Sequence, residues 1–182
     1  MIRPAAKEDV AALLAIYAPY ILTTTYTFEY DVPTLEQFED RFLTITAEYP
    51  WLVWEEDGQI LGYAYGSRAF ERTAYSWDAD MSIYLAPEAK GRGIGKALYL
   101  AVEEILYRQG YHVLYGLVTN TNPGSCAFHK ALGYWEFARH EKTGYKFGQW
   151  LDLIWFEKRL RTGDPTGFPI PWPQLDGKEC IV

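Results

Sequence analysis

The sequence predicts a single α/β domain in which helices cover both faces of a mixed β-sheet. The chain has 182 residues, of which 49% are hydrophobic and 23% are charged, so it can bury one substantial core. Short β-prone runs alternate with segments whose apolar residues recur at helical spacing. The candidate elements follow the order β-α-α-β-β-β-α-β-α-β-β, which is typical of a mixed sheet with helices on both faces.

The first part of the chain predicts a short strand, residues 2–4, followed by two helices. The apolar face of the first helix consists of Val10, Leu13, Leu14, Tyr17 and Ile21. Residues 23–30 are β-prone but lie between two helices, so we expect a loop whose aromatic side chains reach a pocket. The second helix begins at Thr34, because Gln37 three residues later completes a capping box.

Two strands are predicted around the turn Asp57-Gly58, since this dipeptide joins the apolar runs at residues 51–54 and 60–65. A polar connection over residues 68–75 then leads to another strand at residues 76–85. This strand enters the segment that carries the strongest functional signal in the chain.

Residues 81–110 predict the end of a buried strand, a glycine-rich turn and an amphipathic helix that ends at Gly110. A helix start leaves backbone N–H groups free and carries partial positive charge, and glycines let an anion approach them. Lys90, Arg92 and Lys96 add positive charge at the same place. The segment therefore favours a phosphate-bearing cofactor, although a tight turn that needs glycine conformations would explain the same glycines.

Two other phosphate-binding loops are excluded by their spacing. A P-loop requires a glycine where this chain has Lys90 and a Ser or Thr where it has Ala97. A dinucleotide-binding loop requires G-x-G-x-x-G with an acidic residue about 20 residues later. This chain has G-x-G-x-G, and residues 111–115 contain no acid.

The last part of the chain predicts a buried strand of the parallel type at residues 113–118 and two final strands near 135–141 and 149–159. Between them, Asn122 as cap and Pro123 as first residue begin a helix. The predicted apolar face of this helix is Ala127, Phe128, Ala131 and Leu132, with Gly133 at its end.

Charge and composition exclude several classes of protein. The net charge of −7 argues against a nucleic-acid partner. Cys126 and Cys180 are too few for a disulfide scaffold or a zinc cluster, and we predict no metal site. The N-terminus has no long apolar run, so we expect neither a signal peptide nor a membrane span. We therefore expect the protein to be cytoplasmic. Residues from Thr162 onward are proline-rich, and we expect an extended tail that packs on the surface or on a second subunit.

The glycine-rich turn resembles the Q/R-x-x-G-x-G/A signature of the GNAT acetyltransferases, with Lys90, Gly93 and Gly95 in its positions. Lys in place of Gln or Arg is a mild departure. In that family the loop holds the pyrophosphate of acetyl-CoA, which would be the co-substrate here. The resemblance implies the GNAT fold, a mixed and mostly antiparallel sheet with helices on both faces, in residues 1–160. Residues 161–182 would form the tail.

Six short pieces in sequence narrow the resemblance to the phosphinothricin N-acetyltransferase family, which includes acetyltransferases of methionine sulfone and methionine sulfoximine. They lie at residues 49–53 (YPWLV), 74–77 (AYSW), 91–95 (GRGIG), 129–134 (HKALGY), 144–146 (GYK) and 148–152 (GQWLD). Together the resemblance covers about residues 2–160. It implies transfer of an acetyl group from acetyl-CoA to the primary amine of a small amino acid or analogue.

The resemblance also implies catalytic residues. The family's catalytic base is a Glu on the strand before the glycine loop, and Asp80 occupies its position. Asp80 would remove a proton from the amine, directly or through a water. The alternatives are an ion pair of Asp80 with Arg72 or Lys146, or a register in which Asp78 is the base. His129 occupies the position of an acid that protonates the leaving thiolate in many GNAT enzymes, and in this branch a His there contacts the base carboxylate.

The family's cofactor-binding positions map onto three segments. They are the strand residues Ile83, Tyr84 and Leu85, the turn residues Lys90, Gly91, Arg92, Gly93, Ile94, Gly95 and Lys96, and the helix-start residues Asn122 and Ser125. The strand would contribute main-chain hydrogen bonds, while its side chains belong to the core. Asn122 and Ser125 also have a local role at the start of their helix.

For the acceptor, the resemblance implies that Arg72 binds the substrate carboxylate, because Arg suits bidentate binding. Arg68 is an alternative, and Phe28 and Tyr75 would form apolar walls. The family is generally dimeric, so we expect a homodimer, with residues 147–150 as the candidate contact.

Two other functions remain open from the sequence alone. One is a GNAT enzyme that acts on a polyamine or a protein N-terminus, which the acidic net charge favours and Arg72 does not. The other is an acyl-CoA-binding module without catalysis, which only the Asp-for-Glu change at position 80 favours.

Overall fold

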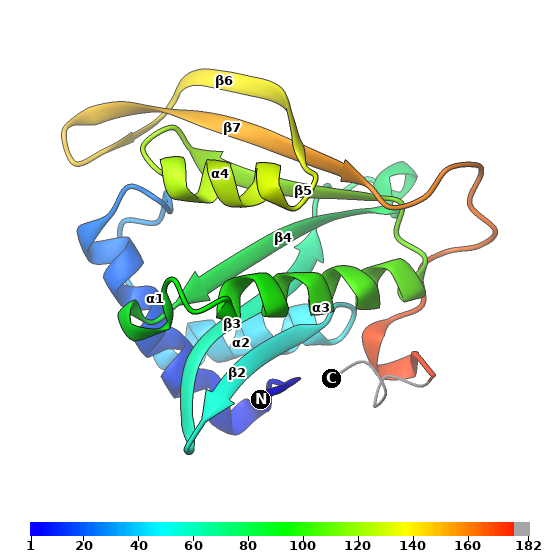
Figure 1. Cartoon of the computed structure of the whole chain (residues 1–182), viewed down its shortest axis with the longest axis horizontal. Coiled ribbons are helices and arrows are strands. Elements are labelled where there is room, and N and C mark those ends of the chain that lie inside the picture. Colours follow the sequence, from blue (N-terminus) through cyan, green and yellow to red (C-terminus); the bar gives the residue numbers. More distant parts are fainter. Residues whose placement is uncertain (177–182) are drawn as a thin grey trace.

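The computed structural model describes residues 1–176 and contains one seven-stranded sheet with the order β1-β2-β3-β4-β5-β7-β6 (Figure 1). The strands are β1 Ile2–Pro4, β2 Trp51–Glu56, β3 Gln59–Arg68, β4 Asp78–Leu85, β5 Val113–Thr119, β6 Trp135–Lys146 and β7 Gln149–Arg159. Neighbouring strands are antiparallel except β4 and β5, which are parallel. The sheet is therefore mixed and mostly antiparallel, as predicted.

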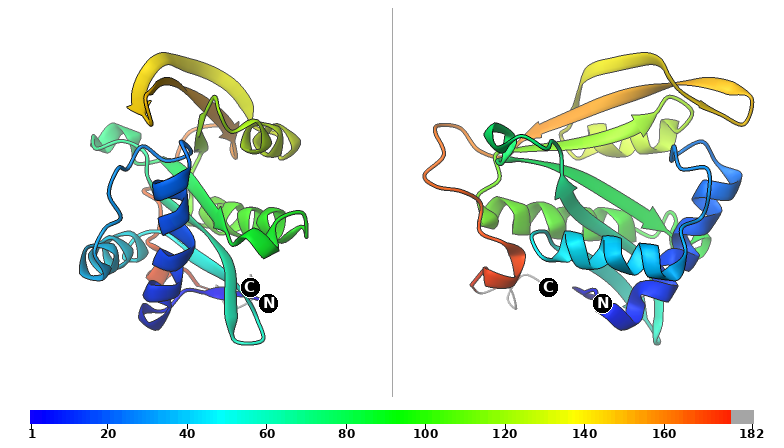
Figure 2. Two further views of the ribbon diagram at one scale, coloured as in Figure 1. Left: turned by 90° about the vertical axis from the view of Figure 1, so that its left-hand side faces the viewer. Right: turned by 180° about the vertical axis from the view of Figure 1, so that it is seen from behind.

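Four α-helices in residues 1–176 flank the sheet: α1 Val10–Thr23, α2 Leu35–Thr46, α3 Ile94–Gln109 and α4 Pro123–Ala131. The helices α1 and α2 cover one face, and α3 and α4 cover the other (Figure 2). This confirms the predicted order and layering. Within the same residues, none of the helices is both long and apolar enough to cross a bilayer.

Local side-chain chemistry sets several of these boundaries. At the start of α2, the Gln37 backbone N–H donates to Thr34 Oγ1 at 3.2 Å and the Thr34 N–H donates to Gln37 Oε1 at 2.8 Å, which is the predicted capping box. At the start of α4, Asn122 Oδ1 accepts from the Ser125 N–H at 3.1 Å. Asp57 and Gly58 have φ of 48° and 77°, as a two-residue hairpin turn requires.

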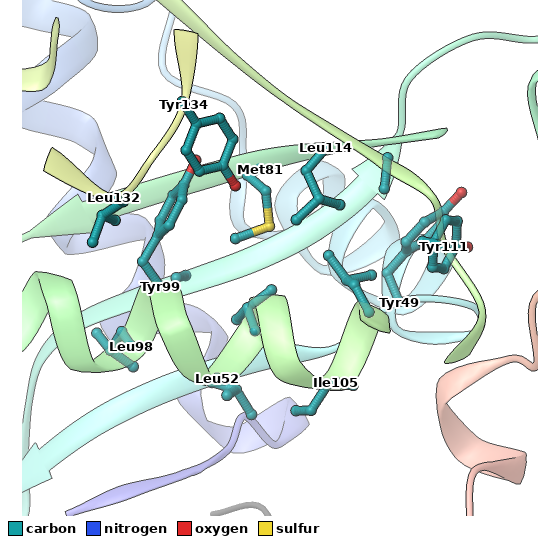
Figure 3. Close-up of a cluster of buried hydrophobic side chains, with 14 of the residues drawn as sticks. Tyr49, Leu52, Met81, Leu98, Tyr99, Ile105, Tyr111, Leu114, Leu132 and Tyr134 are labelled. Atoms are coloured by element: carbon teal, nitrogen blue, oxygen red, sulfur yellow. The ribbon is translucent and has the colours of Figure 1, made fainter. Parts of the chain in front are cut away.

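The larger core lies between the sheet and α3 (Figure 3). Leu98, Tyr99 and Ile105 of α3 point toward the strands, where Leu52 and Met81 meet them. A second core on the opposite face joins α1 and α2 to the sheet. It contains Val10, Leu13, Tyr17, Ile21, Phe38, Phe42, Trp51, Val53 and Tyr63. The two faces of β4 thus pack against different helix layers.

The segment after β7 packs on the chain's own surface. The Trp77 indole N–H donates to the Gly167 carbonyl at 2.8 Å, and the Ile170 N–H donates to the Gln109 carbonyl at 2.8 Å. Trp172 is buried. Residues after β7 thus contact this chain itself, with Trp172 and Leu175 joining the larger core, and Cys180 lies outside the described residues.

The predicted apolar face of the fourth helix is wrong in part. Leu132 is buried and Phe128 packs against the core, as predicted, but Ala127 and Ala131 are exposed, and the buried side chain within α4 is His129, 3% exposed. The reason lies on the facing strand, where Gly116 leaves room for the imidazole: a Cβ there would lie 2.3 Å from His129 Nε2. The chain also continues β6 to Lys146, five residues beyond the predicted end.

Candidate active site

The site is built where β4 and β5 separate. Their ladder pairs Asp78 with Val113, Ala79 with Leu114 and Asp80 with Tyr115, and continues no further. Both strands run on, β4 to Leu85 and β5 to Thr119, while moving apart (Figure 1). Beyond Asp80, main-chain N–H and C=O groups of the two strands therefore form no hydrogen bonds with each other. An extended ligand between the strands could bond to them instead.

Asp80 occupies the last paired position before the separation. Its Oδ1 atom is buried and has no hydrogen-bond partner in the described part of the chain. Burial, with a smaller contribution from the charge of Asp78, raises the pKa of the Asp80 carboxyl to about 7. A carboxyl with this pKa exchanges protons near neutral pH, as a general base must.

The alternative ion pairs of Asp80 are not formed. Within residues 1–176, Asp80 makes no ion pair with Arg72 or Lys146, and the Lys146 ammonium instead donates to the Thr27 carbonyl at 2.9 Å. Asp78, the other candidate for the base, lies on the same face of β4, and burial raises its pKa as well.

The glycines of the glycine-rich turn have two different structural roles. Gly91 and Gly93 have φ of 76° and 80°, and a Cβ on either would meet no atom within 4 Å. They therefore supply left-handed backbone next to open space at the start of α3. Gly95 has another role: a Cβ there would lie 3.1 Å from Leu85 Cδ1 and 3.3 Å from Ile83 Cδ1, so this glycine lets α3 approach β4.

The positive charges of the turn are not equivalent. Lys90 and Lys96 are exposed and form no ion pair with residues 1–176, and Lys90 lies 5.5 Å from the centre of the Tyr20 ring. Arg92 instead pairs with Glu56 of β2 at 2.7 Å. Sequence spacing could not reveal this partner, because it lies 36 positions away.

His129 is not brought together with Asp80. Its Nδ1 donates to the Ser125 carbonyl at 2.8 Å, and its Nε2 lies 2.9 Å from the Tyr99 hydroxyl. Because a carbonyl only accepts, Nδ1 carries the proton and Nε2 accepts from Tyr99. Burial lowers the pKa of His129 and favours this neutral form. The described structure therefore gives no contact between His129 and the proposed base.

Of the predicted cofactor-binding strand residues, Leu85 already has a partner. The Tyr20 hydroxyl donates to the Leu85 carbonyl at 2.7 Å. The Tyr84 ring packs among aromatic side chains of the α1 layer, with Tyr17 at a ring distance of 4.6 Å, so its side chain belongs to the core as expected. Ile94 is buried beneath the turn, 2% exposed.

The predicted acceptor residues fall into two groups. Arg72 and Tyr75 line a cavity of about 210 Å³, together with Phe70 and Arg68. Arg68 pairs with Glu48 at 3.1 Å, whereas Arg72 forms no ion pair with the described residues. This makes Arg72 the available cation of the cavity.

Phe28 lies elsewhere, against β6. A Cβ on Gly144 would lie 2.4 Å from Phe28 Cζ, so this glycine provides the seat for the ring. The neighbouring Thr27 carbonyl accepts from Lys146, and the Tyr30 hydroxyl bonds the Tyr145 carbonyl. The expected loop is confirmed for residues 24–30, whereas Thr23 is the last residue of α1. Within residues 1–176, no ring contact joins Phe28 to Tyr75 and no hydrogen bond joins it to Arg72.

Sequence reasoning missed the aromatic side chains around Asp80. Tyr115 of β5 pairs with Asp80 of β4 on one side and with Glu157 of β7 on the other. Trp155 lies two residues before Glu157 on β7 and so shares its face. Phe70 packs on both rings, at 5.7 Å and 6.1 Å. The alternation of side chains in residues 113–118 and 149–159 could have placed Tyr115 and Trp155 on one face, but nothing local places Phe70 there.

Comparisons with known proteins agree in fold and in chemistry. The chain matches the model of the acetyltransferase (GNAT) domain over residues 2–155. It is 33% identical over 167 residues to a phosphinothricin N-acetyltransferase of Alcaligenes faecalis, with 91% of this chain and 85% of the relative covered. It is 34% identical over 165 residues to an L-methionine sulfoximine/L-methionine sulfone acetyltransferase of Salmonella typhimurium, with 87% of this chain and 94% of the relative covered.

A solved structure extends the similarity to three dimensions. The crystal structure of a GNAT superfamily phosphinothricin acetyltransferase from Sinorhizobium meliloti, in complex with acetyl-CoA, superimposes with a TM-score of 0.89 at 34% identity. The match covers 97% of this chain and 98% of that one.

Proposed function

Since the chain belongs to the GNAT acetyltransferase family and is an acetyl-CoA-dependent N-acetyltransferase, we propose that its acceptor is the primary amine of a small amino acid or analogue. The observation that carries this proposal is the buried carboxyl of Asp80, at the point where β4 and β5 separate. Relatives named for phosphinothricin and for methionine sulfone and sulfoximine support the acceptor class.

The residues present fit acetyl-CoA. The separated strands expose unpaired main chain between Asp80 and the turn, with Ile83 and Tyr84 as the proposed hydrogen-bonding strand. Gly91 and Gly93 leave open space at the N-terminus of α3, where a pyrophosphate would meet free N–H groups, and Lys90 and Lys96 would add charge. Asn122 and Ser125 lie at the start of α4, beside the diverging end of β5.

The acetyl donor supplies an activated carbonyl when bound. Asp80 accepts a proton from the acceptor ammonium, directly or through a water, which leaves a neutral amine able to attack. The raised pKa means that Asp80 can take up this proton near neutral pH. His129 has both ring nitrogens engaged, so its contribution in this state is to hold the carbonyl of Ser125 and thus the first turn of α4.

Arg72 binds the acceptor carboxylate in this proposal. Its guanidinium lines the cavity with Phe70 and Tyr75 and has no ion-pair partner in residues 1–176, so it is free to form a bidentate pair. Phe28, whose ring rests on Gly144 of β6, would add an apolar wall from the loop after α1.

The chain is also proposed to act as a homodimer in the cytoplasm. Phe147 and Trp150, at the tip of the β6–β7 hairpin, are 57% and 58% exposed. Large aromatic side chains at an exposed tip are typical of a protein interface.

The test is thiol release from acetyl-CoA with a panel of amines. The panel contains phosphinothricin, methionine sulfone, methionine sulfoximine, phenylalanine, spermidine and a short peptide. Turnover confined to the amino acids and their analogues supports the proposal. Turnover only with spermidine or the peptide retains the fold and cofactor but overturns the acceptor class. Acetyl-CoA binding without turnover of any amine supports a binding module instead.

A further inference from the structure

A cluster of aromatic rings covers the sheet beside Asp80, centred on Phe70. The Phe70 ring lies 4.6 Å from the Tyr75 ring, 5.7 Å from Tyr115 and 6.1 Å from Trp155, to which it is nearly parallel. Phe137 extends the cluster on Tyr115 and Trp155. Tyr75 and Phe137 are 44% and 38% exposed, so the cluster presents rings to an incoming molecule.

Phe70 lies beside both charged groups of the proposed acceptor site. On one side it packs on Tyr115, the ladder partner of Asp80. On the other it lines the cavity of about 210 Å³ that contains Arg72. We call Phe70, Tyr75, Tyr115, Phe137 and Trp155 the Phe70 cluster. An amino acid whose amine reaches Asp80 and whose carboxylate reaches Arg72 holds its Cα beside Phe70, and its side chain then has the rings of this cluster within reach.

The charged side chains around this cluster leave one cation available to bind an anion of the acceptor. Asp78, Asp80 and Glu157 share the face of the sheet on which it lies. The cation next to Glu157 is Arg159, paired with it at 3.0 Å.

Two further Lys and Arg side chains also have partners. Arg68, on the cavity wall, is paired with Glu48 at 3.1 Å, and Lys146 is bonded to the Thr27 carbonyl. Arg72 is therefore the cation available to the α-carboxylate of the acceptor. A second anion, on the side chain of the acceptor, would lie against aromatic ring faces and carboxylates. Both the negative ring faces and the carboxylates repel it.

We propose that the Phe70 cluster selects acceptors with an uncharged apolar, aromatic or sulfur-containing side chain, and that Phe70 is the specificity-determining residue. This rests on the proposed function, because it assigns the side-chain preference of the same acceptor site. Rings in van der Waals contact gain dispersion and edge-to-face contacts from such side chains. Phosphinothricin, whose side chain is a phosphinate anion, is a poor acceptor on this assignment.

The experiment compares kcat/KM for L-phenylalanine and L-methionine sulfone with kcat/KM for phosphinothricin and L-glutamate, at fixed saturating acetyl-CoA. We expect the neutral acceptors to be preferred by at least about tenfold, the scale on which pocket contacts discriminate substrates. Phe70→Lys supplies a second cation and is expected to shift the neutral-to-anionic ratio by at least about tenfold toward phosphinothricin. Leu43→Lys, on the exposed side of α2, adds the same charge away from the cluster and is expected to leave the ratio unchanged.

A second variant covers the case in which Phe70→Lys does not fold. Phe70→Leu keeps an apolar side chain but removes the ring, and we expect it to lower kcat/KM for phenylalanine severalfold with little change for phosphinothricin. Equal or better use of phosphinothricin by the unaltered chain would overturn the assignment, as would a ratio that neither Phe70 variant changes. If no amino acid is turned over at all, the proposed function fails; calorimetry of CoA-saturated protein then decides the selectivity, and phenylalanine binding no tighter than phosphinothricin overturns it.

Discussion

At the scale of single residues, the proposed role of Asp80 as the base predicts that activity responds to pH. Its pKa of about 7 means that the carboxylate form becomes dominant as pH rises through neutrality. We expect kcat/KM to rise over this range and Asp80→Asn to lower it by about 10² to 10⁴ while acetyl-CoA affinity stays unchanged. A pH–rate profile of both proteins is the measurement. Asp80→Glu, which restores the longer family carboxylate, is expected to keep the ascending limb, and an Asp78→Asn variant that loses it would move the base to Asp78.

The same residue makes folding stability respond to pH in the opposite direction. The carboxyl has a pKa near 3.8 in the unfolded chain and about 7 in the folded one, so the folded state binds more protons between these values. Stability therefore falls as pH rises from about 4 to 7 and levels off above that. Asp80→Asn is expected to raise the free energy of unfolding at pH 8 by up to about 4 kcal/mol, and not at pH 3. Urea unfolding at the two pH values measures this, and a destabilised variant at pH 8 would contradict it.

Residue-scale predictions succeeded where the signal is local. Thr34 with Gln37, and Asn122 with Ser125, cap their helices as their spacing indicates, because caps involve residues three apart. The partners of Arg92 and His129 were not predictable in this way. Glu56 and Tyr99 lie 36 and 30 positions away in the sequence, and only the folded structure brings them next to Arg92 and His129.

At the scale of elements, the packing of α4 on β5 depends on one glycine and one imidazole. Because a Cβ on Gly116 would lie 2.3 Å from His129 Nε2, Gly116→Ala alone is expected to destabilise the protein by about 1–3 kcal/mol through overpacking. In a His129→Ala background the added methyl meets space, so its cost is expected to vanish. Urea unfolding of both single variants and the double variant measures the coupling. Purely additive costs would show that the two groups do not meet.

The turn before α3 gives a test of cofactor binding. Gly93→Val is expected to weaken acetyl-CoA binding by at least about tenfold, because a branched side chain then stands where a phosphate approaches the free N–H groups. Gly58→Val is the matched control, since Gly58 has a nearly equal φ of 77° and open space around it, in the β2–β3 hairpin turn. Calorimetry with acetyl-CoA compares the two. Normal affinity in folded Gly93→Val protein would remove the turn from the cofactor site.

Elements with a strong periodic pattern were predictable, and the exceptions share a physical cause. The strand–turn–helix unit at residues 81–110 and the Asp57-Gly58 hairpin are confirmed. The face of α4 was misjudged because the pattern was read from apolar residues, whereas its inner face is held by a buried histidine with two hydrogen-bond partners. A polar residue that is fully satisfied inside the fold is invisible to hydrophobic periodicity.

At the scale of the whole molecule, the order of elements predicted the layers but not what surrounds the reacting groups. The aromatic cluster beside Asp80 is assembled from β5, β6, β7 and the connection at residues 69–77, with Phe70 at its centre. Each segment contributes one or two rings, so no single stretch of sequence shows the cluster. The division into a domain at residues 1–160 and a tail at residues 161–182 stays a prediction, although residues 167–172 are bonded to Trp77, Gln109 and Glu48.

The β6–β7 hairpin determines the expected assembly. The exposed aromatic side chains toward its tip are Tyr145, Phe147 and Trp150, and β6 is the edge strand of the sheet. Such a surface costs free energy when left in water, so we expect a homodimer that buries it. Trp150→Asp places a charge in that contact and is expected to convert the dimer to monomer at micromolar concentration. Sedimentation equilibrium measures this, with Leu43→Asp on α2 as a control that keeps the dimer. A monomeric unaltered chain at tens of micromolar, or a dimer that survives Trp150→Asp, would contradict the assignment of this hairpin as the interface.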